Sequence, residues 1–172
     1  MEIEKSETYK QLLGLQTSLK GTIGDNKNVI IKQVKLALIS GGEAEGLFTK
    51  MFLLPIIQKI FPNSIVEGVN SAGKTQFKHT FFGAKPAPDF IIEEPAKIVG
   101  EVKYDFFATR SVATAIGQIL LYLEASKAES QQYDYGCIIF FDTSLKFKEQ
   151  KKEESHFIEH LWTNENIFLI II

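Results

Sequence analysis

The chain has 172 residues, of which 45% are apolar and 23% are charged, and its formal net charge is -2. This composition predicts a single globular domain and excludes fibrous and intrinsically disordered proteins. The charge balance excludes a wholly basic nucleic-acid wrapper, although a local basic patch can still bind phosphate. No run reaches the roughly 18 consecutive apolar residues of a bilayer span, and Glu2 and Glu4 stand where a leader would be basic. We therefore expect a soluble cytoplasmic protein with no membrane partner.

Residues 1–62 are expected to be mostly helical. Apolar residues at helical spacing predict a helix over residues 6–20, and two glycines with an Asp-Asn pair predict a loop over residues 21–28. Residues 29–38 fit a helix or a strand, and we favour the helix. From Gly41 onward, apolar residues recur at intervals of three and four as far as Pro62. This pattern predicts a long amphipathic helix with a local adjustment at Pro55.

Short strands and a further helix are expected after Pro62. Residues 64–69 are partly β-branched and predict a strand, while residues 89–93 and 98–106 alternate in polarity and predict a hairpin. The tight turn at residues 94–97 joins the two hairpin strands. An amphipathic pattern over residues 111–125 then predicts a second long helix.

The end of the chain is strongly apolar. Residues 136–141 form a continuous apolar run, typical of a strand that is covered on both faces. Charges of both signs in residues 146–154 favour a solvated helix face over a binding arm. Residues 166–172 predict a terminal strand that is either buried in the sheet or covered by a partner. No repeat or flexible linker divides the chain, so we expect one α/β domain.

One segment matches a phosphate-binding loop. Residues 68–75 fit G-x-x-x-x-G-K-[ST] at every position, and residues 138–142 resemble the strand that ends in a metal-binding acid. A phosphate loop must be followed by a helix, but a glycine and two prolines interrupt residues 76–88. A small P-loop NTPase is therefore the less favoured alternative.

The same region predicts a cationic loop. Residues 70–88 contain no acid and include three lysines, Lys74, Lys78 and Lys85. We expect these lysines, together with Arg110, to contact DNA phosphates, which would make the DNA affinity fall with salt. The alternative is an ordinary solvated loop.

Two carboxylates and a lysine fall on the predicted hairpin. Alternation in a strand places Glu101 and Lys103 on one face, and Asp89 opens the neighbouring strand. Carboxylates on adjacent strands repel each other unless a cation neutralises them, and such oxygen ligands suit Mg²⁺ or Mn²⁺. Such a metal can activate water for phosphodiester hydrolysis, and an adjacent lysine can orient that water. The alternative is a solvated ion pair between Glu101 and Lys103.

Two motifs lie on this hairpin, Pro88-Asp89 and Glu101-Val102-Lys103, within a predicted order of helix, three strands, helix and strand. This combination resembles the PD-(D/E)XK nuclease superfamily. The resemblance covers about residues 41–142. It implies a restriction-endonuclease-like αβββαβ core, in which helices flank a central mixed sheet. Residues 1–40 would be an N-terminal helical extension and residues 143–172 a C-terminal extension.

Two helix motifs extend the resemblance. Residues 41–45, Gly-Gly-Glu-Ala-Glu, are similar to a helix start in the Mrr-like enzymes, which implies Glu45 as an additional acid with Glu43 as its competitor. Gln118 and Tyr122 lie four apart, on one helix face, and resemble the Q-x-x-x-Y element of the RecB-like branch. The resemblance implies that Gln118 orients the site or contacts the DNA backbone. The alternative is a polar helix edge with a half-buried tyrosine.

The superfamily resemblance also implies a role for each hairpin residue. Asp89 and Glu101 would bind Mg²⁺, for which Mn²⁺ can substitute, with help from the Val102 carbonyl. Lys103 would position the attacking water. The expected function is a Mg²⁺-dependent DNA endonuclease of restriction or repair type, acting as a homodimer that forms through the apolar C-terminal strand. The alternative is a non-catalytic or subunit-type nucleic-acid-binding module of the same fold.

Overall fold

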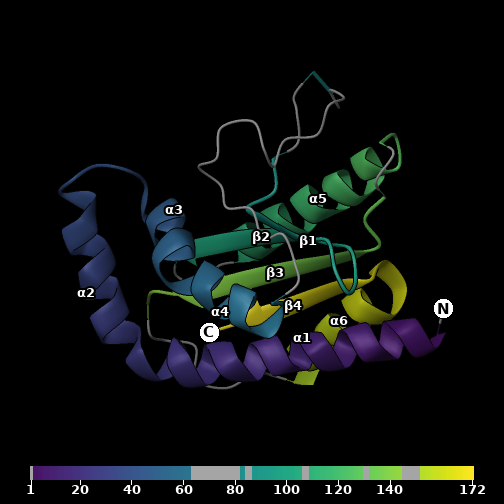
Figure 1. The fold of residues 1–172 in the computed structure, drawn as a ribbon, viewed down its shortest axis with the longest axis horizontal. Coiled ribbons are helices and arrows are strands. Elements are labelled where there is room, and N and C mark those ends of the chain that lie inside the picture. The colour runs from purple at the N-terminus through teal and green to yellow at the C-terminus, as the bar shows by residue number, and fades with distance from the viewer. Residues whose placement is uncertain (1, 63–81, 84–86, 106–108, 130–131, 145–151) are drawn as a thin grey trace.

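The computed structural model describes residues 2–62, 82–83, 87–105, 109–129, 132–144 and 152–172. Its centre is a mixed sheet with strand order β1-β2-β3-β4 (Figure 1). The strands are β1 (Phe90–Ile92), β2 (Ile98–Asp105), β3 (Tyr135–Asp142) and β4 (Ile167–Ile171). β1 runs antiparallel to β2, whereas β2, β3 and β4 run parallel to one another.

The connections explain these directions. A short turn joins β1 to β2, which is sufficient for an antiparallel pair, whereas parallel neighbours need a crossover. α5 (Thr109–Ser126) makes the crossover from β2 to β3, and α6 (Lys152–Glu165) makes the crossover from β3 to β4. The remaining helices precede the sheet in the chain: α1 (Glu2–Thr22), α2 (Lys27–Leu38), α3 (Ala44–Phe48) and α4 (Leu54–Ile60).

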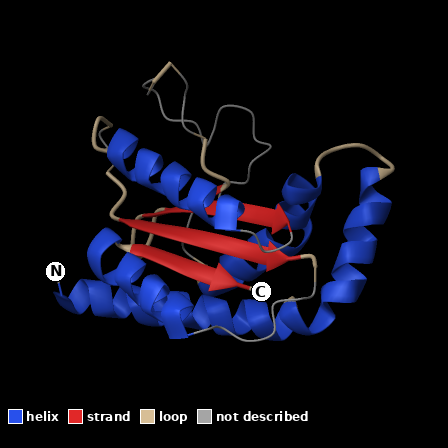
Figure 2. Ribbon diagram, turned by 180° about the vertical axis from the view of Figure 1, so that it is seen from behind, coloured by secondary structure: helices blue, strands red, loops and turns tan. Residues whose placement is uncertain are grey.

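Helices cover both faces of the sheet (Figures 1 and 2). Side chains of β3 alternate between two buried clusters: Cys137 and Ile139 pack with α1, α3 and α4, while Ile138 and Phe140 pack with α5 and α6. Every residue of β3 is buried, as its apolar run predicts for a strand covered on both faces. The α/β class with a mixed sheet between helices is thus confirmed.

Two glycines allow close packing around the sheet. A Cβ added to Gly100 on β2 would lie 2.1 Å from Cζ of Phe90, so the Phe90 ring lies directly over the glycine. A Cβ added to Gly136 on β3 would lie 2.3 Å from Cγ2 of Ile119, where α5 packs on the sheet. These close approaches lie between β1 and β2 and between β3 and α5.

The loop predicted at residues 21–28 is wrong. α1 continues to Thr22, a 3₁₀ turn covers Gly24–Asn26, and α2 begins at Lys27. The N–H of Ile23 donates to Leu19 O at 2.8 Å, and the Asn26 side chain donates to Thr22 O at 2.9 Å. Because Ile23 is also buried in the core, tertiary packing keeps this glycine-containing segment helical. The helix favoured at residues 29–38 is confirmed as α2.

The long helix predicted over residues 41–62 is present in three pieces. Gly41 and Gly42 have φ values of +103° and +99°, a conformation that excludes them from the helix. α3 therefore starts at Ala44, and a π-helical segment, Thr49–Leu53, separates it from α4. Pro55, the second residue of α4, lies just after this segment and lacks the N–H that would bond to the preceding turn. The adjustment expected at Pro55 lies in that π-helical segment.

The C-terminal strand is buried within its own chain. Ile167 and Ile170 are fully buried, and β4 pairs with β3 beside α6 and α1. Of the two alternatives left by the sequence, burial in the sheet is correct, so the apolar side chains of β4 give no reason to place a dimer interface there. The strand predicted at residues 64–69 lies outside the described residues, as does most of the charged stretch 146–154.

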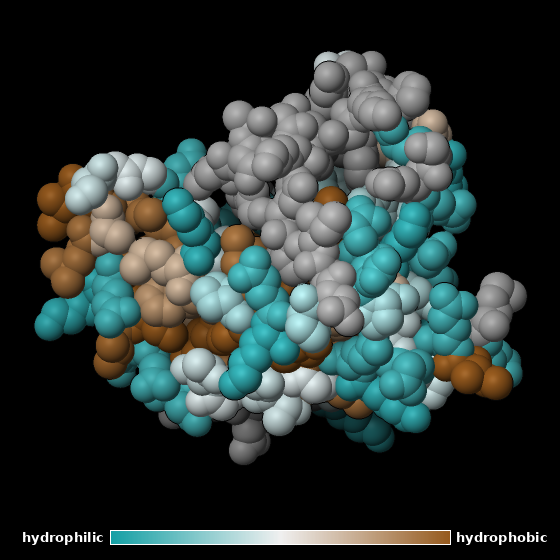
Figure 3. Space-filling model, viewed as in Figure 1, coloured by the Kyte–Doolittle hydropathy of each residue, from teal (hydrophilic) through white to brown (hydrophobic). Residues whose placement is uncertain are grey.

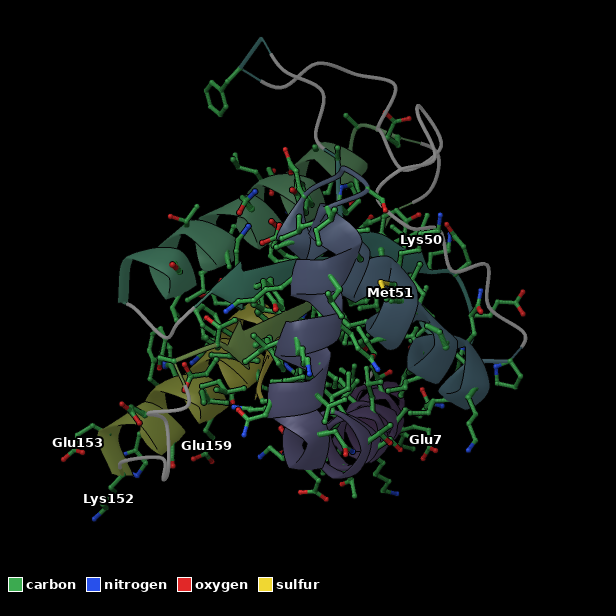
Figure 4. All side chains as sticks on the ribbon, turned by 90° about the vertical axis from the view of Figure 1, so that its left-hand side faces the viewer. Glu7, Lys50, Met51, Lys152, Glu153 and Glu159 are labelled. Atoms are coloured by element: carbon green, nitrogen blue, oxygen red, sulfur yellow. The ribbon has the colours of Figure 1, made fainter. Side chains whose placement is uncertain are left out.

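α2 buries one side only. Ile30 and Val34 pack into the core, whereas Val29 and Leu36, and Ile39 just after the helix, are exposed. Apolar surface accordingly gathers at the left of the molecule over α2 (Figure 3). Figure 4 views this side and shows Lys50 and Met51 of the π-helical segment on it. No helix in the described part of the chain has both the length and the apolar content needed to cross a membrane.

Candidate metal centre

Three separate elements bring acids to one place beside β2. Glu101 lies in the middle of β2, Asp89 immediately precedes β1, and Glu45 lies in the first turn of α3. One oxygen atom from each carboxylate lies within 4.8 Å of the other two. Asp89 and Glu101 are buried, and Glu45 is partly exposed. Within the described residues this is the group of acids with the geometry to hold a metal ion.

The sheet positions Asp89 through two hydrogen bonds. Its backbone N–H donates to Gly100 O at 2.9 Å, which extends the pairing of β1 with β2 by one residue. Its carboxylate atom Oδ2 accepts a hydrogen bond from the Val102 N–H at 2.6 Å. The side chain is therefore fixed against the strand that carries Glu101.

Hydrogen bonds also fix the other two acids, Glu45 on α3 and Glu101 on β2. Glu45 Oε2 accepts a hydrogen bond from the Tyr104 N–H of β2 at 3.3 Å. Tyr122 of α5 donates its hydroxyl hydrogen to Glu101 Oε2 at 3.0 Å and also lies 3.2 Å from Ala87 O. Burial, followed by the neighbouring Glu101, raises the pKa of Tyr122 well above its ordinary value, so the phenol stays protonated and remains a donor.

Lys103 completes the cluster. Its Nζ lies 2.6 Å from Glu101 Oε1 and 4.0 Å from Glu45 Oε1. Burial lowers the pKa of Lys103, but the attraction and hydrogen bond of Glu101, helped by Glu45 and Asp89, outweigh this effect and leave the pKa raised. Lys103 is therefore cationic over the whole physiological pH range.

The acids outnumber this single lysine. Burial, and after it the charge of Glu101, raises the pKa of Asp89 to about 8. Burial also raises the pKa of Glu101, although Lys103 and Tyr122 oppose the change. The cluster thus holds protons that a divalent cation would displace. Buried carboxylate oxygens with uncompensated charge fit Mg²⁺ or Mn²⁺, because these ions prefer oxygen ligands.

Gln118 lies behind the tyrosine. It hydrogen-bonds to Tyr122, while its own Oε1 is buried and has no hydrogen-bond partner in the described structure. Gln118 is thus connected to Glu101 through Tyr122. The spacing of four predicted that the two side chains share a helix face, but it gave no sign that Tyr122 contacts an acid.

The other residues predicted from the sequence lie outside the acid cluster or contribute no side chain to it. Glu43 precedes α3, is exposed and lies outside the acid cluster, whereas Glu45 lies in it. The Val102 side chain packs into the core on the opposite face of the sheet, and its carbonyl as a metal ligand remains a prediction. Asp142, the acid of the NTPase alternative, ends β3 and accepts a hydrogen bond from Ser144 N at 3.0 Å.

The expected DNA contacts lie largely outside the described residues. This holds for Lys74, Lys78 and Lys85 and for the whole phosphate-loop match at residues 68–75. Arg110 lies in the first turn of α5, but its side chain is not described.

Comparisons with family models, with curated proteins and with solved structures gave no match for this chain. The candidate site is therefore defined by its own geometry.

Proposed function

We propose that this protein is a Mg²⁺-dependent endonuclease that hydrolyses phosphodiester bonds in DNA, with a restriction-endonuclease-like fold. The observation that carries the proposal is the meeting of Glu45, Asp89 and Glu101 around Lys103. Three acids with one lysine form an electrostatically unfavourable group in the absence of a cation. A divalent ion would relieve that repulsion and would supply the charge that phosphoryl transfer needs.

The acids would bind the metal ion, and the lysine would position the water. Asp89, Glu101 and Glu45 would hold the ion, which when bound would polarise a phosphoryl oxygen and lower the pKa of a water molecule. Lys103 already donates a hydrogen bond to Glu101, and its Nζ would orient the attacking water with its remaining hydrogens. Gln118 would support Tyr122 and so the position of Glu101.

The proposed substrate rests on phosphate chemistry. The cationic loop at residues 70–88 precedes Asp89 directly in the chain, so phosphate contacts there would deliver DNA to the acids. Double-strand cleavage would need a second site, which a homodimer would provide.

Plasmid cleavage tests the proposal. We expect the wild-type protein to convert supercoiled DNA to nicked or linear forms in Mg²⁺, and EDTA to abolish this activity. Lys103→Ala should lower the rate by about 100-fold or more, because the positioned water is lost. Lys127→Ala is the matched control, since Lys127 directly follows α5 and its exposed side chain pairs with that of Glu124. Equal cleavage by Lys103→Ala and wild type, with contaminating nucleases excluded, would overturn the proposal.

A further inference from the structure

In each of the three acids, one oxygen accepts a hydrogen bond from a donor other than Lys103. Asp89 Oδ2 accepts from Val102 N–H at 2.6 Å, and Glu45 Oε2 accepts from Tyr104 N–H at 3.3 Å. The hydroxyl of Tyr122 lies 3.0 Å from Glu101 Oε2. Half of each carboxylate is therefore committed to the fold.

The second oxygens of Glu101 and Glu45 face Lys103. Oε1 of Glu101 and Oε1 of Glu45 lie 2.6 Å and 4.0 Å from Lys103 Nζ. Asp89, which is 7% exposed, makes no further hydrogen bond within the described residues, so its Oδ1 has no donor there. The cluster thus offers at most one oxygen per residue, and the one from Glu101 is shared with Lys103, which donates a hydrogen bond to it.

The two backbone donors are rigid. Gly100 O accepts from Asp89 N at the end of the β1–β2 ladder, so the next amides on that side of β2 are those of Val102 and Tyr104. β1 does not extend far enough to pair with these amides. The carboxylates of Asp89 and Glu45 bind them instead, and turning either acid to present both oxygens would leave a strand N–H unpaired.

The third donor is rigid as well, although it is a side chain. Tyr122 is 6% exposed on α5, which packs against β2 and β3. Its hydroxyl cannot follow Glu101 if that side chain rotates. Glu101 therefore loses this hydrogen bond if it presents both oxygens to a ligand.

We infer that these three donors restrict the acids to one ligand oxygen each, and that the site thereby selects Mg²⁺ over Ca²⁺. This inference rests on the proposed metal-dependent function. Mg²⁺ is small, takes six ligands and retains several waters, so it accepts single carboxylate oxygens. Ca²⁺ takes six to eight ligands and commonly binds both oxygens of a carboxylate. A site that withholds the second oxygen therefore favours the smaller ion.

Tyr122 is the donor that substitution can remove. Tyr122→Phe deletes the hydroxyl and keeps the ring, so Glu101 becomes free to present both oxygens. We expect Mg²⁺ affinity to fall about tenfold, as is typical when a ligand loses its supporting hydrogen bond. Ca²⁺ affinity should stay equal or rise, because the second oxygen is released. The dissociation constant for Ca²⁺ divided by that for Mg²⁺ should therefore fall about tenfold.

The experiment is calorimetric titration of the full chain with MgCl₂ and with CaCl₂, without DNA. Tyr133→Phe is the matched control, because Tyr133 is 5% exposed and donates its hydroxyl to Glu93, away from the cluster. Thermal unfolding establishes that each variant is folded. Tyr133→Phe should leave the ratio of the two dissociation constants unchanged.

The possible results separate this inference from the function on which it rests. Equal weakening of both ions in Tyr122→Phe would overturn the selective role of Tyr122. A wild-type protein that binds Ca²⁺ as tightly as Mg²⁺ would overturn the inference even if the variant does not fold, and would leave the nuclease proposal standing. A wild-type protein that binds neither ion would overturn both.

Discussion

Lys103 Nζ lies 2.6 Å from Glu101 Oε1, two residues away on the same face of β2. Both side chains are largely buried, at 17% and 3% exposure, so water screens the pair only weakly. The ion pair compensates one of three acids, so Asp89 and Glu45 are left as the further ligands for a metal ion. The consequences of that imbalance can be measured.

The stability of the metal-free protein should fall as the pH rises. The pKa of Asp89 is raised from 3.8 to about 8, so the folded protein binds this proton more tightly than the unfolded chain does. Between those values each pH unit lowers the free energy of unfolding by about 1.4 kcal/mol for one such proton. Denaturation in EDTA between pH 5 and pH 8.5 measures this slope.

Asp89→Asn is the control for that slope. Asparagine cannot ionise but retains an oxygen that accepts from the Val102 N–H. The variant should be more stable than the wild type at pH 8.5, and the difference should shrink toward pH 4. Parallel curves for the two proteins would contradict the raised pKa.

Glu45 and Glu43 should differ in metal binding. Glu45→Gln removes a charged oxygen from the cluster, so Mg²⁺ affinity should fall by about tenfold or more, since even the loss of a ligand's hydrogen-bond partner has that effect. Glu43→Gln changes an exposed residue that precedes α3 and should bind Mg²⁺ as the wild type does. Calorimetric titration with Mg²⁺ measures both affinities. Equal losses of affinity in the two variants would contradict a role for Glu45 as a metal ligand.

Two glycine substitutions should have opposite effects on stability. Gly100→Ala places a Cβ 2.1 Å from Cζ of Phe90, and overpacking of this kind costs about 1–3 kcal/mol. Gly117→Ala on α5 meets no atom within 4 Å and should stabilise the protein by about 0.5–1 kcal/mol, because alanine favours the helix. Urea unfolding compares them, and a neutral Gly100→Ala would show that the Phe90 ring moves aside.

Local patterns in the sequence predicted much of this fold because their causes are local. The intervals of three and four that predict α5 place Ala115 and Ile119 in the core. The apolar run of β3 reflects its burial on both faces. Strand alternation alone placed Glu101 and Lys103 on one face, and the structure shows them in contact.

Tertiary contacts explain what the sequence patterns did not predict. Glu45 reaches the cluster because Phe48, one turn later, packs against the sheet. Its ring centroid lies 5.1 Å from that of Tyr104 and 4.6 Å from that of Phe141. No spacing within α3 encodes contacts with β2 and β3. The bond between Tyr122 and Glu101 joins residues 21 positions apart, and it too depends on how α5 lies across the sheet.

Because β1 is short, Asp89 and Glu45 have a second role as hydrogen-bond acceptors for backbone N–H groups of β2. Open N–H groups along a strand edge invite pairing with another chain and hence aggregation. On β2 the acceptors for Val102 and Tyr104 are carboxylates, so the charges that would hold a metal also protect this edge against intermolecular pairing. Alanine at position 45 or 89 would therefore expose the edge as well as remove a ligand. Amide replacements retain an acceptor and separate the loss of chemistry from the loss of solubility.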